Sequence, residues 1–126
     1  MARIESFKEL IVYQKAYTLA MMIFELTKNF PKEEKYSLTD QVRRSSRSVT
    51  SNIAEAWAKR RYEKFFINKL TDSLGEELET SVWIDYAKDC QYITPESHKE
   101  LCNDYTEVRK MLISMLNNPG QWCQSS

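Results

Sequence analysis

Apolar residues recur every three or four positions in four stretches of this 126-residue chain, the spacing that gathers them on one face of an α-helix. The pattern predicts helices over about residues 6–29, 38–57, 62–91 and 95–117. Four amphipathic helices joined by short links form an up-down bundle most simply. We therefore expect an all-α protein with one four-helix-bundle domain over residues 1–118 and a C-terminal tail over residues 119–126.

Each predicted helix carries a stripe that is expected to face the core. In the first helix it is Leu10, Tyr13, Tyr17, Ala20 and Phe24, with Val12, Leu19, Met22, Ile23 and Leu26 beside it. In the second it is Leu38, Val42, Ser45, Val49, Ile53 and Trp57. In the third it is Ile67, Leu70, Leu74, Leu78, Val82, Tyr86 and Cys90, next to an acidic ridge of Asp72, Glu76, Glu79 and Trp83. In the fourth it is Leu101, Tyr105, Val108, Leu112 and Met115.

Several residues predict where the helices begin and end. The first helix is expected to end at Phe30, because the residue before Pro31 is pushed out of the α region. The hydroxyl of Ser37 is expected to cap the second helix by accepting from a free backbone N–H. Thr94 is expected to cap the fourth, with Pro95 at its first position, where the missing N–H costs no hydrogen bond.

Glycine is scarce, and this excludes several functions. With glycines only at Gly75 and Gly120, the chain has no phosphate-binding loop, so nucleotide chemistry is not expected. Gly75 lies inside the third predicted helix, where it costs about 1 kcal/mol against alanine. We interpret it as permitting a close contact between helices.

The cysteines and the hydropathy indicate the compartment. Cys90, Cys102 and Cys123 have no C-x-x-C spacing, so we expect neither a disulfide framework nor a zinc ligand set. The first residues contain no apolar signal region, and the longest apolar run, residues 19–24, is far below the roughly 20 residues of a membrane helix. We expect a soluble cytoplasmic protein that does not span a membrane.

Charge is separated along the chain although the formal net charge is zero. Residues 35–69 hold nine basic and three acidic residues, a balance of +6. Residues 70–107 hold two basic and ten acidic residues, a balance of −8. The middle of the chain is therefore expected to form a basic surface.

The residue types that catalysis requires are sparse. His98 is the one histidine of the chain, and we expect it to be exposed with no cysteine beside it, so no nucleophile–base pair is predicted. A di-iron site requires a Glu-x-x-His on each of two helices, which one histidine cannot supply. Glu76 and Glu79 are expected to accept hydrogen bonds from Arg43 or Arg44, or to face solvent. We expect no catalytic residue, no cofactor and no metal; an enzyme would require a buried polar pocket.

The basic cluster is the strongest functional signal. The candidate nucleic-acid-binding residues are Arg43, Arg44, Arg47, Lys59, Arg60, Arg61 and Lys64, interleaved with Trp57 and Tyr62. Cations that neutralise phosphates, beside aromatic rings that stack on bases, are typical of nucleic-acid-binding surfaces. In the alternative, the arginines pair with the acidic ridge of the third helix and Trp57 belongs to the core. A ring of subunits would repeat the cluster and strengthen binding.

Five segments together resemble one bacterial family. They are VYQKA (residues 12–16), FPKEEKYSL (30–38), QVRRSSRSV (41–49), NIAEAW (52–57) and ETSVWI (79–84). Over about residues 10–115 the chain resembles the four-helix-bundle family named for proteins encoded within intervening sequences of 23S ribosomal RNA genes. Thr50 stands where a proline is usual in that family, and Ala56-Trp57 stands where glycine is usual.

The resemblance implies a left-handed four-helix bundle that assembles into a ring-like homo-oligomer, a pentamer, with no known catalytic residues. A related group is similar to the accessory variability determinant of diversity-generating retroelements, which binds nucleic acid and a reverse transcriptase. We expect a non-enzymatic homo-oligomer that binds RNA or DNA through the basic cluster. The alternative is a protein-interaction adaptor, such as an accessory protein of a reverse transcriptase, whose arginines serve helix and subunit contacts.

Overall fold

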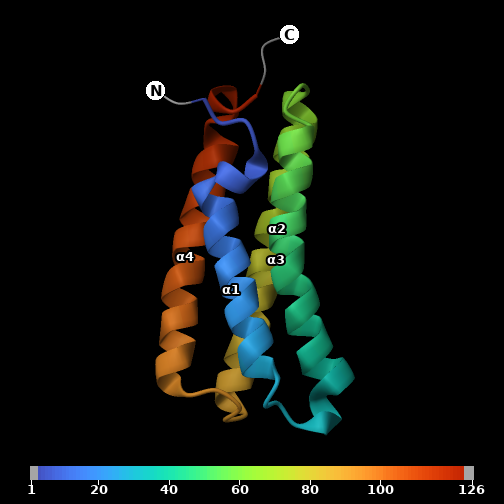
Figure 1. The fold of residues 1–126 in the computed structure, drawn as a ribbon, viewed down its shortest axis with the longest axis vertical. Coiled ribbons are helices and arrows are strands. Elements are labelled where there is room, and N and C mark those ends of the chain that lie inside the picture. The colour runs from blue at the N-terminus through green and yellow to red at the C-terminus, as the bar shows by residue number, and fades with distance from the viewer. Residues whose placement is uncertain (1–2, 124–126) are drawn as a thin grey trace.

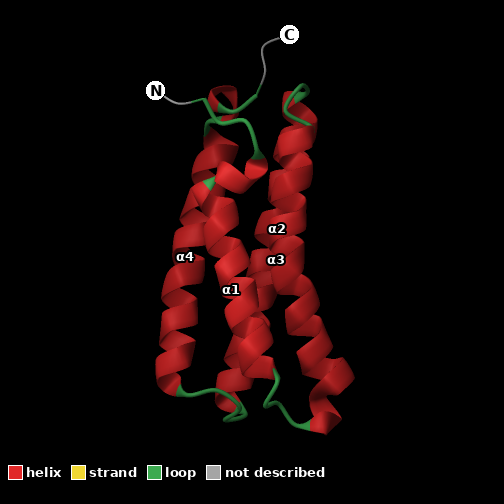
Figure 2. Ribbon diagram, viewed as in Figure 1, coloured by secondary structure: helices red, strands yellow, loops and turns green. Residues whose placement is uncertain are grey.

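The computed structural model describes residues 3–123, and it contains four long helices. These are α1 (Ile11–Thr27), α2 (Asp40–Ala58), α3 (Glu63–Asp89) and α4 (Pro95–Asn117). Short 3₁₀ turns lie at Phe7–Glu9 (η1), Lys32–Glu34 (η2) and Pro119–Gln121 (η4), and a π-helical turn, η3, at Lys35–Thr39. No strand occurs within residues 3–123, which confirms the all-α prediction (Figure 2).

The four helices run alternately up and down, and each lies beside its neighbours in sequence (Figure 1). α1 also contacts α4, which closes the bundle. Both η1 and η4 lie at the end of the bundle that carries the α2–α3 link, whereas the other two links lie at the opposite end (Figure 1). Within residues 3–123, none of the helices has the apolar stretch that a membrane-spanning helix requires.

The first helix begins at Ile11, later than Ser6, because residues 6–9 form a separate capped turn. The Ser6 hydroxyl accepts from the backbone N–H of Lys8 at 3.2 Å, and the Glu9 carboxylate accepts from the backbone N–H of Ser6 at 2.8 Å. This reciprocal capping closes η1 on itself. Leu10 then adopts an extended backbone conformation and buries its side chain.

Ser37 does not cap α2, so that prediction was wrong. Its hydroxyl donates to the Glu34 carboxylate at 2.7 Å within a turn that runs directly into α2 at Asp40. The Tyr92 hydroxyl donates to the other oxygen of the same carboxylate at 2.8 Å. The bonds from Ser37 and Tyr92 lower the pKa of Glu34, and the bond to Glu34 raises the pKa of Tyr92 to about 12. The α1–α2 link is thereby tied to the α3–α4 link.

The start of α4 agrees with its prediction. The backbone N–H of Ser97 donates to the Thr94 hydroxyl at 3.0 Å, and Pro95 occupies the first helical position. The predicted core stripe of α4 is also confirmed, since all five of its residues are buried. They are Leu101, Tyr105, Val108, Leu112 and Met115.

The predicted core stripe of α3 was wrong along much of its length. Leu78, Val82 and Tyr86 are 46%, 50% and 57% exposed, and Cys90 is exposed as well. A run of residues spaced by four advances about 40° around a helix at each step, so it cannot remain on one face. The residues that α3 buries follow a strict four–three spacing and are Phe66, Leu70, Ser73, Glu77, Thr80, Ile84 and Ala87.

The predicted stripe of α1 lies partly at the edge of the core. Tyr17 is exposed, whereas the neighbouring positions Leu19 and Ile23 are buried. Both faces of this helix are apolar, so periodicity alone does not choose between them. Ala16 and Ala20 lie on the buried face, where small side chains permit close helix packing.

Hydroxyl groups join α2 and α3 in the core. The Thr80 hydroxyl donates to the Ser45 hydroxyl at 2.8 Å, and the Ser73 hydroxyl donates to the Val49 carbonyl at 2.8 Å. All of these residues are buried, and their small side chains allow the two helices to approach closely. The interpretation of Gly75 as a contact point between helices was wrong for this chain, because no atom of a neighbouring helix lies within 4 Å of the position its Cβ would take.

A buried ion pair joins α3 to α4. The Glu77 carboxylate is fully buried, and Arg109 donates to its two oxygens from Nε at 2.6 Å and from Nη2 at 3.0 Å. Ser81 donates a further bond at 2.8 Å. The bond to Glu77 raises the pKa of Arg109. The bidentate geometry supplies the partners that a buried carboxylate requires.

Candidate nucleic-acid interface

The seven candidate basic residues form two groups in the structure. The helix-2 group, at the beginning of α2, is Arg43, Arg44 and Arg47. The corner group, around the α2–α3 link, is Lys59, Arg60, Arg61 and Lys64. Lys59 follows Arg47 by twelve positions along α2 and its C-cap, a rise of about 18 Å. The cluster that is continuous in sequence is therefore two separate surfaces.

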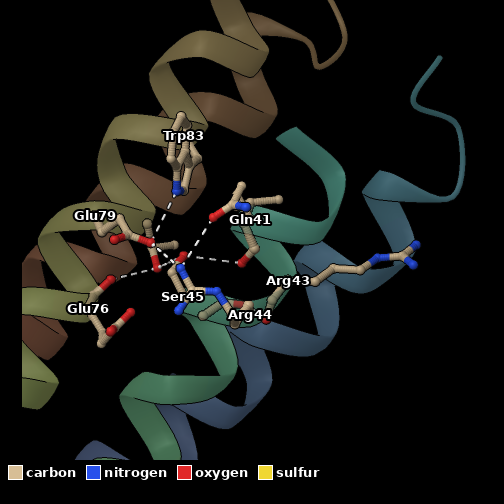
Figure 3. Close-up of polar contacts among 10 residues, drawn as sticks. Gln41, Arg43, Arg44, Ser45, Glu76, Glu79 and Trp83 are labelled. Carbon is tan, nitrogen blue, oxygen red and sulfur yellow. Dashed lines mark hydrogen bonds and ion pairs between the residues drawn. The ribbon is translucent and has the colours of Figure 1, made fainter. Parts of the chain in front are cut away.

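The helix-2 group divides over two sides of α2. Arg44 Nη2 lies 3.3 Å from a Glu79 carboxylate oxygen that also accepts from Trp83 Nε1 at 3.3 Å, and Arg43 points away from that contact (Figure 3). The expected pairing of Arg44 with the acidic ridge is thus confirmed for Glu79. Glu76 instead keeps one buried carboxylate oxygen without a partner in the described structure, and its pKa is raised by burial and by Glu79.

Arg43 and Arg47 lie on the side of α2 that faces α1. Arg43 Nε donates to the Thr27 hydroxyl at 2.7 Å. The guanidinium carbons of Arg43 and Arg47 lie 4.8 and 5.8 Å from the centroid of the Phe24 ring, distances typical of a cation–π contact. Phe24 was expected in the core, but its side chain is half-buried and its ring contacts the guanidinium groups of two arginines.

Phe7 of η1 and Tyr13 and Tyr17 of α1 form an aromatic row. The two tyrosines lie on the same side of α1 as Phe24. The ring of Tyr13 lies 5.0 Å from that of Phe7 and 6.0 Å from that of Tyr17, measured between centroids. Tyr17 is exposed. Tyr13 packs against the core, as expected, whereas the expectation that Tyr17 faces the core was wrong. This row as a possible stacking surface was not predicted. Its helical spacing is the same as that of a core stripe, so only packing distinguishes the two.

Arg60 is the member of the corner group whose guanidinium is held by contacts within the protein. Its guanidinium carbon lies 3.4 Å from the centroid of the Trp57 ring, and its Nε donates to the Trp57 carbonyl at 2.8 Å. Burial, together with the nearby Arg3, lowers the pKa of Arg60, although a guanidinium remains charged at neutral pH. Trp57 therefore holds Arg60 in place and does not offer that face to a base.

Two other members of the corner group, Lys59 and Arg61, contact an exposed aromatic pair. Tyr62 and Phe65 are 55% and 49% exposed, and their ring centroids lie 5.7 Å apart in an edge-to-face arrangement. Lys59 Nζ lies 5.9 Å from the Phe65 ring, and the Arg61 guanidinium carbon lies 5.8 Å from the Tyr62 ring. Phe65 was absent from the sequence-based site.

Three of the four corner cations have no acidic partner among the described residues. Within residues 3–123, no salt bridge involves Lys59, Arg61 or Lys64. The corner therefore combines accessible charge with exposed π surface, whereas the helix-2 group has protein partners for Arg43 and Arg44.

The expectation that His98 has no cysteine beside it was wrong. Cys102 follows His98 by one helical turn, and its Sγ lies 3.4 Å from the His98 Nε2 atom. The same nitrogen lies 2.8 Å from an Asp85 carboxylate oxygen. The i, i+4 spacing of His98 and Cys102 was the sequence signal for this contact.

Comparison with known proteins indicates the family. The family model of 23S rRNA-intervening sequence proteins matches residues 8–114. A crystal structure from Bacteroides thetaiotaomicron, described as a protein with unknown function from the S23 ribosomal protein family, has 35% sequence identity and a TM-score of 0.76. The alignment covers 85% of this chain and 96% of that one. A comparison with curated proteins found no match. Neither the description of the matched family nor that of the crystal structure names an enzymatic activity. The chain belongs to the family of 23S rRNA-intervening sequence proteins.

Proposed function

We propose that this protein is a cytoplasmic, non-enzymatic homo-oligomer that binds single-stranded RNA or DNA through the corner group. The observation that carries the proposal is the exposed Tyr62–Phe65 pair, whose rings are contacted by Lys59 and Arg61. Lys64 lies between the two aromatic residues in sequence, and none of the three cations has a salt bridge in the described structure. Aromatic faces stack on unpaired bases, and lysine and arginine neutralise phosphates. The corner offers both within one short segment.

The helix-2 group has a supporting role in this proposal. Arg47 has no salt-bridge partner among the described residues, and the exposed Tyr17 belongs to the α1 face on which Arg43 and Arg47 rest. A strand that leaves the corner along α2 would meet these residues after about 18 Å, a distance of a few nucleotides. Arg43 and Arg44 contribute less, because their protein contacts already occupy part of each guanidinium.

Assembly into a homo-oligomer is supported by the outer face of α3. Leu78, Val82 and Tyr86 follow one another at spacings of four and are about half exposed, so they form an apolar stripe. Such a stripe is commonly covered by another protein surface. We propose that a second copy covers it in a ring, a pentamer, and that the ring repeats the corner group. Repetition strengthens a modest phosphate-binding surface through multivalency.

The binding proposal is tested by titrating a labelled single-stranded RNA at two salt concentrations. We expect binding that weakens as salt rises, and a smaller salt slope in the double variant Arg61→Glu and Lys64→Glu, by about 0.7 for each lost phosphate contact. The matched control, Lys99→Glu and Lys110→Glu, makes the same change of charge on α4 and is expected to affect binding little. Absence of binding at low salt, or equal losses in both variants, would contradict the proposal.

The stacking contribution is tested separately with Tyr62→Ala and Phe65→Ala. Each is expected to weaken binding by about 1–3 kcal/mol without changing the salt slope, because stacking involves no phosphate. Tyr36→Ala is the control, since Tyr36 is also exposed but lies on the link at the opposite end of the bundle. A loss equal to that of the control would show that the corner rings do not stack on bases.

A protein-interaction adaptor, such as an accessory protein of a reverse transcriptase in a diversity-generating retroelement, is the second candidate. The observation that favours it is that Arg43 and Arg44 make contacts within the protein, to Thr27 and Glu79. This candidate predicts that Arg43→Ala and Arg44→Ala disrupt the oligomer, as measured by light scattering. In the nucleic-acid proposal, the same variants leave the oligomer intact, and Val82→Lys on the apolar stripe disrupts it.

A further inference from the structure

Three side chains with different donor atoms converge where α3 packs against α4. Asp85 comes from α3, and His98 and Cys102 come from α4. One donor atom from each lies within 4.8 Å of the other two. His98 and Cys102 are separated by four residues, so they project from the same face of α4 toward Asp85.

The hydrogen bonds of this cluster depend on which nitrogen of the His98 ring carries the proton. His98 Nε2 lies 2.8 Å from the Asp85 carboxylate oxygen and 3.4 Å from Cys102 Sγ, so one nitrogen faces both groups. If Nε2 carries a proton, it donates to Asp85, and the lone pair of the neutral ring is then on Nδ1, 3.9 Å from Cys102 Sγ. If Nε2 has no proton, its one lone pair can accept from the thiol, and it makes no hydrogen bond to the carboxylate oxygen 2.8 Å away. A cation at the centre would satisfy a carboxylate, an imidazole and a thiolate together.

The distances suit a tetrahedral transition metal. Zinc binds sulfur at about 2.3 Å, nitrogen at about 2.0–2.1 Å and carboxylate oxygen at about 2.0–2.2 Å, so donor atoms around it lie about 3.4–3.6 Å apart. The sulfur–nitrogen distance of 3.4 Å already has this value, and the nitrogen–oxygen distance of 2.8 Å requires a small outward movement. The Asp85 side chain is 65% exposed, so it is free to make that movement.

We propose that Asp85, His98 and Cys102 bind a divalent transition metal of the zinc class, with water at a fourth position. Sulfur and nitrogen donors favour this class and disfavour magnesium and calcium, which prefer oxygen ligands. The metal would clamp α3 to α4 near the link between them. The proposal is independent of nucleic-acid binding, because these residues lie outside both basic groups.

Metal binding here must release the thiol proton. Burial raises the pKa of Cys102, and the charge of Asp85 raises it further. A bound cation opposes both effects, because it stabilises the thiolate and pairs with the carboxylate. Affinity is therefore expected to increase with pH across the neutral range.

The test is a titration of the full-length, reduced, metal-free protein with Co²⁺, followed by visible and near-ultraviolet absorption. We expect one Co²⁺ per chain, the d–d bands of a tetrahedral site and a thiolate-to-cobalt charge-transfer band, all displaced by Zn²⁺ and not by Mg²⁺. Cys102→Ser should abolish the charge-transfer band. His98→Ala and Asp85→Asn should each weaken Co²⁺ binding by about tenfold or more.

Cys90→Ser is the matched control, because Cys90 is an exposed thiol outside the cluster. It should leave spectrum and affinity unchanged. Absence of Co²⁺ bands at millimolar metal, or a charge-transfer band that survives Cys102→Ser or disappears with Cys90→Ser, would overturn the proposal. Asp85→Asn changes only an exposed side chain, so unchanged Co²⁺ affinity in that variant would overturn the assigned ligand set even if Cys102→Ser does not fold.

Discussion

Helices α3 and α4 bury residues at the same four–three spacing but fill those positions with different chemistry. The buried residues of α4 are all apolar apart from the hydroxyl of Tyr105. Those of α3 include Ser73, Glu77 and Thr80, whereas Leu78 and Val82 are half exposed. In α4 the hydrophobic effect selects the core face. In α3 hydrogen bonds and an ion pair allow polar residues into the core and leave apolar residues outside for another surface.

Among the variants that test this comparison, Arg109→Ala should lower the free energy of unfolding the most. It leaves the fully buried Glu77 carboxylate without its charge partner, and we expect the free energy of unfolding to fall by about 3–5 kcal/mol. Urea denaturation measures the change. The double variant Glu77→Leu with Arg109→Met replaces the pair by apolar groups and should recover most of the loss. A loss in Arg109→Ala below about 1 kcal/mol would show that solvent reaches Glu77.

Val108→Thr places a hydroxyl at a buried position of α4. α4 would then bury a polar side chain, as α3 does at Ser73 and Thr80. Val108 is fully buried among apolar neighbours, and we expect a loss of about 1–3 kcal/mol from burying the added polar group. Chemical denaturation followed by circular dichroism measures it. A neutral result would mean that α4 tolerates polarity as α3 does, and the contrast between the helices would disappear.

Thr80→Val makes the opposite exchange, at a buried position of α3. It keeps the shape of the side chain and removes the bond from Thr80 to Ser45, so we expect a loss of about 1 kcal/mol. The same denaturation measurement applies. An increase in stability would show that the hydroxyl pair serves the specificity of packing and does not stabilise the bundle.

Gly75→Ala should have the smallest effect, and in the stabilising direction. Gly75 is an exposed position inside α3 with open space around the added methyl group. Alanine is favoured over glycine there by about 0.8–1.0 kcal/mol. A small rise in the melting temperature is the expected observation. A decrease would indicate that a second copy of the chain approaches α3 at this position.

The basic residues of the candidate site differ in how far the sequence predicts their surroundings. The positions of the seven basic residues along the chain were evident, but their partners were not. Arg44 meets Glu79 across 35 residues of sequence, and Arg43 rests on Phe24 of another helix. Conversely, the exposure of Phe65 depends on how the α2–α3 link turns. Pairing between helices is a property of packing, so a charge pattern alone did not separate free cations from occupied ones.

By itself, the sequence determined four helices, the cap of α4 at Thr94, the core face of α4 and the basic character of the α2–α3 corner. Local backbone preferences and a clear period of apolar residues are sufficient for these features. Only the tertiary structure decided the buried face of α3, the division of the arginines over two sides of α2, and the convergence of Asp85 with His98 and Cys102. These features depend on which helix lies opposite each side chain, because a buried polar group is stable only where a partner from another helix reaches it.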